Sequence, residues 1–65
     1  MNVGKSLKIA LAQREITQAE LAEKIGVSGA NLSKTANTAT ASGTTIDKLA
    51  KGLGMSSSEF IALGE

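Results

Sequence analysis

The side chains available for chemistry in this chain are hydroxyls, amides, amines and carboxylates. Its 65 residues include no cysteine, histidine, proline, tryptophan or tyrosine. Without an imidazole or a thiolate, the chain lacks the ordinary ligands of zinc, haem and iron–sulfur clusters, and it has no histidine to activate a serine. Adjacent Ser–Lys pairs such as Ser33 and Lys34 point about 100° apart on a helix, which is not a nucleophile–base geometry. We therefore expect no metal, no cofactor and no enzymatic activity.

The middle of the chain predicts a helix followed by a tight turn. Thr17 and Glu20 form a capping-box pattern ahead of a helix from Gln18 to about Ile25. Gly26 follows, and glycine suits the left-handed conformation that ends a helix. The chain must then turn sharply.

A second short helix is predicted directly after this turn. Ser28 is a candidate N-cap, and the segment from Ala30 to Thr35 has Leu32 as its one strong apolar anchor. This helix is therefore mostly polar and exposed. Two consecutive short helices of this kind are typical of a helix-turn-helix, in which the second helix enters the major groove of DNA.

Three more helices and no strands are predicted in the rest of the chain. A helical stripe of apolar residues spans about Asn2 to Arg14, and similar spacing returns after the turn-rich loop 37–44. The fourth helix is expected to be capped by Thr44 or Thr45, to be weakened by Gly52 and to end near Gly54. The fifth is expected to open with a capping box formed by Ser56 and Glu59 and to end at Gly64.

Several strings of the sequence closely resemble the phage repressor and Cro (XRE-type) helix-turn-helix family. They are Ile-Thr-Gln-Ala-Glu-Leu-Ala-Glu-Lys-Ile-Gly-Val-Ser at 16–28, Leu-Ser-Lys at 32–34 and Leu-Ala-Lys-Gly-Leu-Gly-Met-Ser at 49–56. The resemblance covers nearly the whole chain. It implies an all-α, compact five-helix lambda-repressor-like DNA-binding domain spanning 1–65, with the second and third helices forming the helix-turn-helix at about 17–36.

The function that this resemblance implies is sequence-specific, dimeric transcription regulation. The protein is expected to be a repressor that occupies a palindromic DNA operator and blocks polymerase in the cytoplasm of a bacterium, with either the bacterium or a phage as the source of its gene. A different hypothesis keeps the fold as a protein-interaction module, such as an antirepressor or an antitoxin-like partner, without strong DNA binding. The 65 residues represent either a compact Cro-like regulator or one domain of a longer repressor.

The resemblance also implies which residues contact DNA. Gln18 at the start of its helix would bind a phosphate, unless it is simply an exposed first-turn glutamine, and Ser28 would cap the next helix with or without a phosphate contact. The positions that face bases are Gly29, Ala30 and Lys34, of which only the lysine can hydrogen-bond a base. The full predicted set is Thr17, Gln18, Ser28, Gly29, Ala30, Asn31, Ser33, Lys34, Asn37 and Thr38.

Lys34 has two interpretations, a base contact at guanine O6 and N7 or a contact with phosphate alone. The loop after it departs from the family, because Thr38 stands where glycine is usual and 39–44 contains no lysine or arginine. Phosphate contacts from hydroxyls and amides release fewer counterions, so we expect modest affinity that depends weakly on salt. The same neutral loop also suits a partner-binding surface or a flexible connector.

This chain lacks both members of a buried ion pair that is common in the family. Leu11 and Ala36 occupy the positions where many relatives pair an arginine with a glutamate. Replacing both members of such a pair by apolar residues is often neutral or favourable for stability. We expect the fold to survive this change.

The last helix contains Phe60, the only aromatic residue of the chain. Phe60 either fills the core or joins Ile61 and Leu63 in a two-fold dimer contact, as the C-terminal helix of the family often does.

The net charge of +1 neither indicates nor excludes a polyanionic partner. The first residues, 1–11, have only scattered apolar side chains, so we expect neither a signal peptide nor a membrane span. The expected partners are double-stranded DNA, a second copy of the chain and a protein such as an antirepressor.

Overall fold

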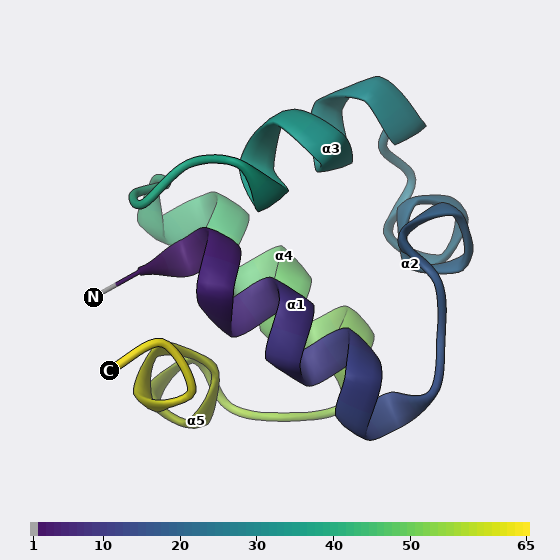
Figure 1. The fold of residues 1–65 in the computed structure, drawn as a ribbon. Helices are drawn as coiled ribbons and strands as arrows, with labels where there is room; N and C mark the ends of the chain where they lie inside the picture. The colour runs from purple at the N-terminus through teal and green to yellow at the C-terminus, as the bar shows by residue number, and fades with distance from the viewer. Residues whose placement is uncertain (1) are drawn as a thin grey trace.

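The computed structural model describes residues 2–65, and over these residues the chain forms five α-helices and no strand (Figure 1). This confirms the all-α, five-helix prediction. Figure 1 shows α1 crossing the front with α4 behind it, α3 along the top, α2 at the right and α5 below. The helices are α1 Val3–Arg14, α2 Gln18–Ile25, α3 Gly29–Ala36, α4 Gly43–Leu53 and α5 Ser57–Ala62.

A short polar side chain starts each helix. The cap accepts a hydrogen bond from the amide three residues later, which satisfies one of the free N–H groups of the first turn. α4 begins earlier than expected, because its cap is Ser42 rather than Thr44 or Thr45; the Thr45 amide donates to the Ser42 hydroxyl over 3.3 Å. The five caps are Asn2, Thr17, Ser28, Ser42 and Ser56, and the capping boxes predicted for α2 and α5 are both present.

Three helices end in a left-handed residue. Gly26 and Gly54 were expected to end α2 and α4, and their φ angles are 74° and 73°. α1 ends at Glu15, which has a φ of 55° although a side chain is strained in this region. α5 differs from the expectation, because Leu63 ends it in right-handed conformation and Gly64 has no positive φ.

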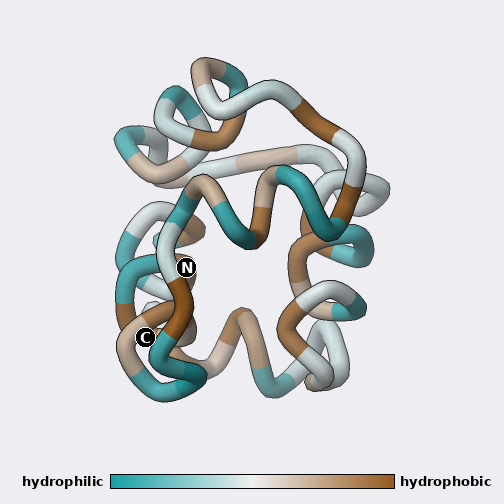
Figure 2. Tube along the Cα trace, turned by 90° about the vertical axis from the view of Figure 1, so that its right-hand side faces the viewer, coloured by the Kyte–Doolittle hydropathy of each residue, from teal (hydrophilic) through white to brown (hydrophobic). Residues whose placement is uncertain are grey.

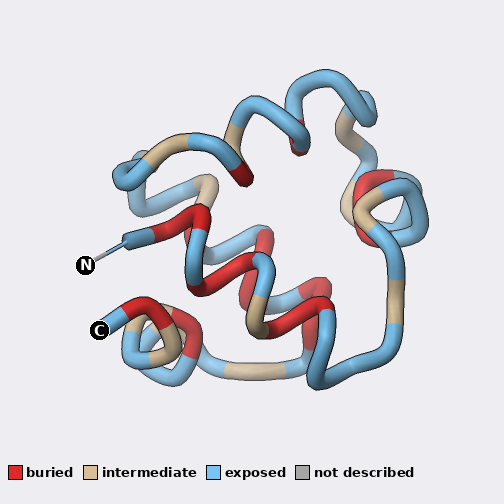
Figure 3. Tube along the Cα trace, viewed as in Figure 1, coloured by how far each residue is buried: buried red, intermediate tan, exposed pale blue. Residues whose placement is uncertain are grey.

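The core lies between α1 and α4, and each of the other helices turns an apolar side towards it. In Figure 2 hydrophobic and hydrophilic positions alternate along the helices, and Figure 3 shows buried residues on their inner sides. Helical spacing also predicts Ala12 of α1 and Ala19 of α2 on the apolar sides of their helices, but both are exposed. The buried apolar residues are Val3, Leu7, Ala10, Leu11, Leu21, Ala22, Leu32, Ala36, Ile46, Leu49, Ala50, Leu53 and Phe60.

Gly52 weakens α4 as a helix but allows α4 to lie directly against α2. A Cβ at this position would overlap the side chains of Ile25 and Leu21. Next to Gly52, at the same end of α4, the carbonyl of Leu53 accepts a hydrogen bond from the Arg14 Nε of α1 over 2.8 Å. This bond satisfies a carbonyl in the last turn of α4, which would otherwise lack an intrahelical partner.

Ser6 is the one buried polar side chain among residues 2–65, and its hydroxyl has no hydrogen-bond partner. Leaving a buried hydroxyl unpaired costs about 1–3 kcal/mol. We therefore expect Ser6→Ala to raise the free energy of unfolding by about 1 kcal/mol, measured by urea denaturation. Ser58→Ala is the control, because Ser58 is exposed on a helix and gains only in helix propensity. A loss of stability in Ser6→Ala would contradict the unpaired hydroxyl.

Candidate nucleic-acid interface

The turn between α2 and α3 is fixed by local hydrogen bonds. The Val27 amide donates to the carbonyl of Ala22 over 3.0 Å, which closes the end of α2 around Gly26. The Ser28 hydroxyl then accepts a hydrogen bond from the Asn31 amide over 3.1 Å and starts α3. The cap interpretation of Ser28 is therefore confirmed, and its contact with phosphate stays a prediction.

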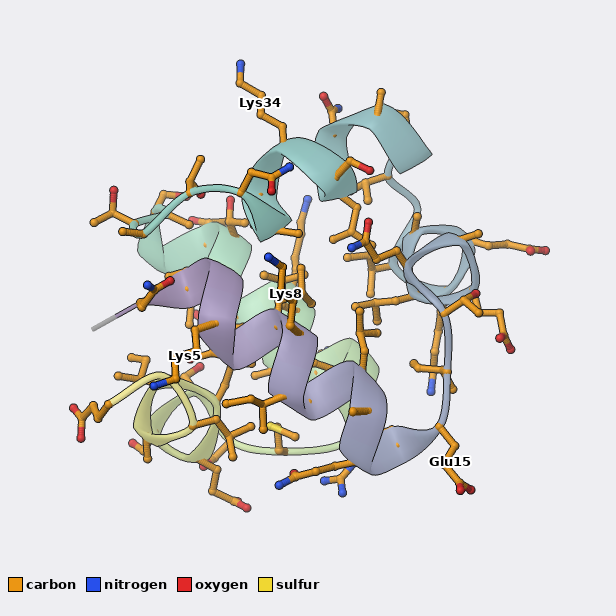
Figure 4. All side chains as sticks on the ribbon, viewed as in Figure 1. Lys5, Lys8, Glu15 and Lys34 are labelled. Carbon is orange, nitrogen blue, oxygen red and sulfur yellow. The ribbon has the colours of Figure 1, made fainter. Side chains whose placement is uncertain are left out.

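α3 buries one side and presents the other to solvent. Leu32 and Ala36 are 2% and 3% exposed and hold the helix on the core. The outer side is exposed along its length (Figure 3), and Figure 4 shows Lys34 projecting from it, away from the body of the molecule. The predicted contact residues on this exposed side are Gly29, Ala30, Asn31, Ser33, Lys34 and Asn37.

Gln18 and Ser33 are brought together although they are 15 residues apart. The Ser33 hydroxyl donates to the Gln18 Oε1 over 3.2 Å. Gln18 is half-buried, and whether it binds a phosphate stays a prediction. Because this bond occupies the carbonyl oxygen of the side chain, the amide group of Gln18 remains the part that can donate to a phosphate.

Other predicted contact residues already use their donors within the protein. The Thr17 hydroxyl donates to the Glu20 carboxylate over 3.2 Å. The Thr38 hydroxyl lies 3.0 Å from the backbone carbonyl of Thr35 and 3.2 Å from that of Thr40, and it can donate to either. A hydroxyl has only one hydrogen to donate. Phosphate contacts by Thr17 and Thr38 therefore stay predictions that require these bonds to be exchanged.

Asn37 ends α3 and keeps part of its donor capacity. Its Nδ2 donates to the carbonyl of Ser33 over 3.0 Å, and its backbone amide donates to the carbonyl of Lys34 over 3.1 Å. A side-chain amide carries two N–H groups, so one is left for a phosphate. The residue is exposed, at the point where α3 meets the neutral loop.

Lys5 and Lys8 were not part of the predicted site, but they lie beside this loop. Both line a groove of about 490 Å³ whose opposite wall includes Asn37 and Thr38. Figure 4 shows both lysines on the exposed side of α1, far from Glu15. The regular three-residue spacing of the lysines shows that they share a helix face, but nothing in the sequence shows that this face adjoins the end of α3.

The two positions that lack the ion pair of the relatives are both buried. Leu11 is 7% exposed and Ala36 is 3% exposed, and both belong to the same apolar core. Neither side chain needs a polar partner there, so the loss of both charges leaves no unpaired group at either of these two positions.

The burial of Phe60 supports the first of its two interpretations, in which it fills the core. Its side chain is 0% exposed, and α5 packs against both α1 and α4. A dimer contact by Phe60 would require this side chain to leave the core. Ile61 and Leu63 are half-buried at the edge of the core, and their part in a dimer stays a prediction.

Residues 2–65 contain no group of three or more acidic side chains arranged to hold a metal ion. No helix in the same part of the chain is both long and apolar enough to cross a membrane.

The fold and the exposed polar helix define a helix-turn-helix protein. The chain belongs to the family of Cro/C1-type HTH DNA-binding domains, whose family model matches residues 6–63. This confirms the resemblance to the XRE-type family. A search of the curated proteins finds no match to the chain. Membership indicates a DNA-binding regulator.

Proposed function

We propose that this protein is a sequence-specific repressor that binds a palindromic DNA operator as a dimer in the bacterial cytoplasm. The chain would act as a single DNA-binding domain over 1–65, with α3 in the major groove. The observation that carries this proposal is the exposed polar side of α3, held next to Gln18 at the start of α2. The family supports the choice of DNA as the partner.

The chemistry of the exposed side indicates how a sequence would be recognised. Asn31 and Lys34 are exposed and carry hydrogen-bonding groups that would reach base edges, whereas Gly29 and Ala30 would allow close approach of the α3 backbone. Gln18 would bind a phosphate at the start of α2, where the helix dipole favours an anion. The phosphate contact would set the position of the protein on the DNA, and the base contacts would set its sequence preference.

The test is selection from a randomised duplex pool at near-physiological salt, followed by sequencing of the retained DNA. We expect enrichment of a palindrome with half-sites about 10 base pairs apart, because a two-fold dimer places its two α3 helices about 34 Å apart. A single enriched half-site would contradict the dimer but not the DNA binding. If a folded sample enriches nothing, the repressor proposal fails, and the protein-interaction hypothesis takes its place.

The same selection with Lys34→Ala separates the two interpretations of this lysine. Loss of a base contact relaxes the preference at one position and costs roughly 1–3 kcal/mol of discrimination. Loss of a phosphate contact weakens binding to all sequences equally. Unchanged binding would remove Lys34 from the interface.

A further inference from the structure

We propose that Lys5 and Lys8 form a second phosphate-binding site, on α1 rather than on the helix-turn-helix. This site would supply the positive charge that the loop after α3 lacks, since 39–44 contains no lysine or arginine. Its ligand is the phosphodiester backbone of the DNA strand that passes the end of α3. The inference rests on the proposed DNA-binding function.

The two lysines are held at a fixed place relative to α3. The backbone amides of Val3 and Gly4 donate to the carbonyls of Ala39 and Thr38 over 2.9 and 2.8 Å. These bonds tie the first turn of α1 to the segment that leaves α3. Lys5 and Lys8 follow on the exposed side of the same helix, and in Figure 4 the Lys8 side chain points towards α3. Both lysines line one groove with Asn37 and Thr38, so a DNA strand lying in this groove would pass both.

The groove has the shape and the polar groups of a strand-binding surface. Lys5 and Lys8 line one side, and Asn37 and Thr38 line the other. Lysines three residues apart on a helix have Cβ atoms about 5–6 Å apart, and their long side chains move freely. DNA carries one phosphate about every 3.4 Å along the axis of each strand, so the two amines can engage successive phosphates.

The charge at this place is not explained by the fold. Lys5 lies in the first turn of α1, where the helix dipole disfavours a cation, and that turn contains no acidic residue. The side chains that line the groove, all within the described residues, include two lysines and no carboxylate. A bound phosphate would neutralise this positive charge and accept hydrogen bonds from the amines.

The experiment measures binding to a fluorescent mixed-sequence duplex over a range of salt concentrations. The test variant is Lys5→Gln with Lys8→Gln. The matched control is Lys24→Gln with Lys51→Gln, which removes the same charge from a separate hollow between α2 and α4. A third variant, Lys5→Arg with Lys8→Arg, keeps the charge. Circular dichroism checks that all of them remain folded.

We expect the test variant to lower the magnitude of the slope of log affinity against log salt by about 2, since each phosphate contact contributes about 0.9. At about 0.1 M salt this corresponds to roughly 10- to 60-fold weaker binding. The arginine variant should keep the slope of the wild type, and the control should change it by less than the test variant.

Two results would overturn the inference, and they differ in what else they overturn. If the wild type binds the duplex but the test and control variants behave alike, the α1 site does not exist and the proposed function stands. If the wild type has no affinity for duplex even at low salt, the proposed function fails as well.

Discussion

Replacing Gly4 by alanine is expected to destabilise the protein by about 3 kcal/mol, a large part of the roughly 3–10 kcal/mol available to a domain of this size. A Cβ at Gly4 would lie 2.5 Å from the carbonyl oxygen of Ala36 and 2.7 Å from that of Thr38. Both atoms belong to the backbone and cannot move aside as a side chain does. The start of α1 must therefore separate from the end of α3.

Gly43→Ala is the matched control for this prediction. Gly43 is also the first-turn glycine of a helix, but a Cβ there meets nothing within 4 Å. We expect its stability in urea denaturation to equal or slightly exceed that of the wild type, because alanine is the better helix former. Equal stability of Gly4→Ala and Gly43→Ala would show that the close packing of α1 on α3 is not needed.

Gly4→Ala also bears on DNA binding. Separation of α1 from the loop breaks the hydrogen bond from the Gly4 amide to the carbonyl of Thr38. Lys5 and Lys8 then lose their fixed position beside Asn37. The fold and the proposed α1 site therefore depend on the same close approach.

Phe60→Ala is expected to cost about 3–5 kcal/mol, which is enough to leave much of the protein unfolded. Phe60 is the largest fully buried side chain among residues 2–65, and its removal leaves a cavity where α5 meets α1 and α4. The loss should be independent of protein concentration, because the side chain contacts the core and not a second subunit. Thermal unfolding at two protein concentrations measures both the loss of stability and its dependence on concentration.

Ile61→Ala provides the comparison for Phe60→Ala. Ile61 is half-buried against the core, so its truncation should cost less than that of Phe60. If the destabilisation by Phe60→Ala shrinks as the protein is concentrated, Phe60 belongs to a dimer contact rather than to the core of one subunit. A concentration-dependent effect confined to Ile61→Ala would instead support its place at a dimer edge.

The sequence by itself determined the helices and the turn of the helix-turn-helix. Capping boxes at Thr17 and Ser56 and a glycine at 26 act through hydrogen bonds and dihedral preferences within a few residues, so their pattern is visible in the chain. The start of α4 was misplaced for a local reason too. Ser42, Thr44 and Thr45 all carry a hydroxyl, and side-chain chemistry alone does not choose among them.

The left-handed Glu15 and the burial of Phe60 were decided by the tertiary structure. Nothing about a glutamate signals a positive φ, and the angle is imposed by the path from α1 to α2. Amphipathic spacing places Phe60 on the apolar side of its helix, but it does not distinguish a core from a dimer contact. Only the packing of α5 on α1 and α4 makes that choice.

The candidate site also combines features that the sequence predicts with contacts that only the tertiary structure determines. The exposed residues of α3 follow from helical periodicity once Leu32 is recognised as the residue that faces the core. The bond between Ser33 and Gln18 and the position of Lys8 beside Asn37 join residues far apart in the sequence. Such contacts depend on how whole helices pack, and the packing is fixed by the summed burial of the core and by close approaches such as that at Gly4.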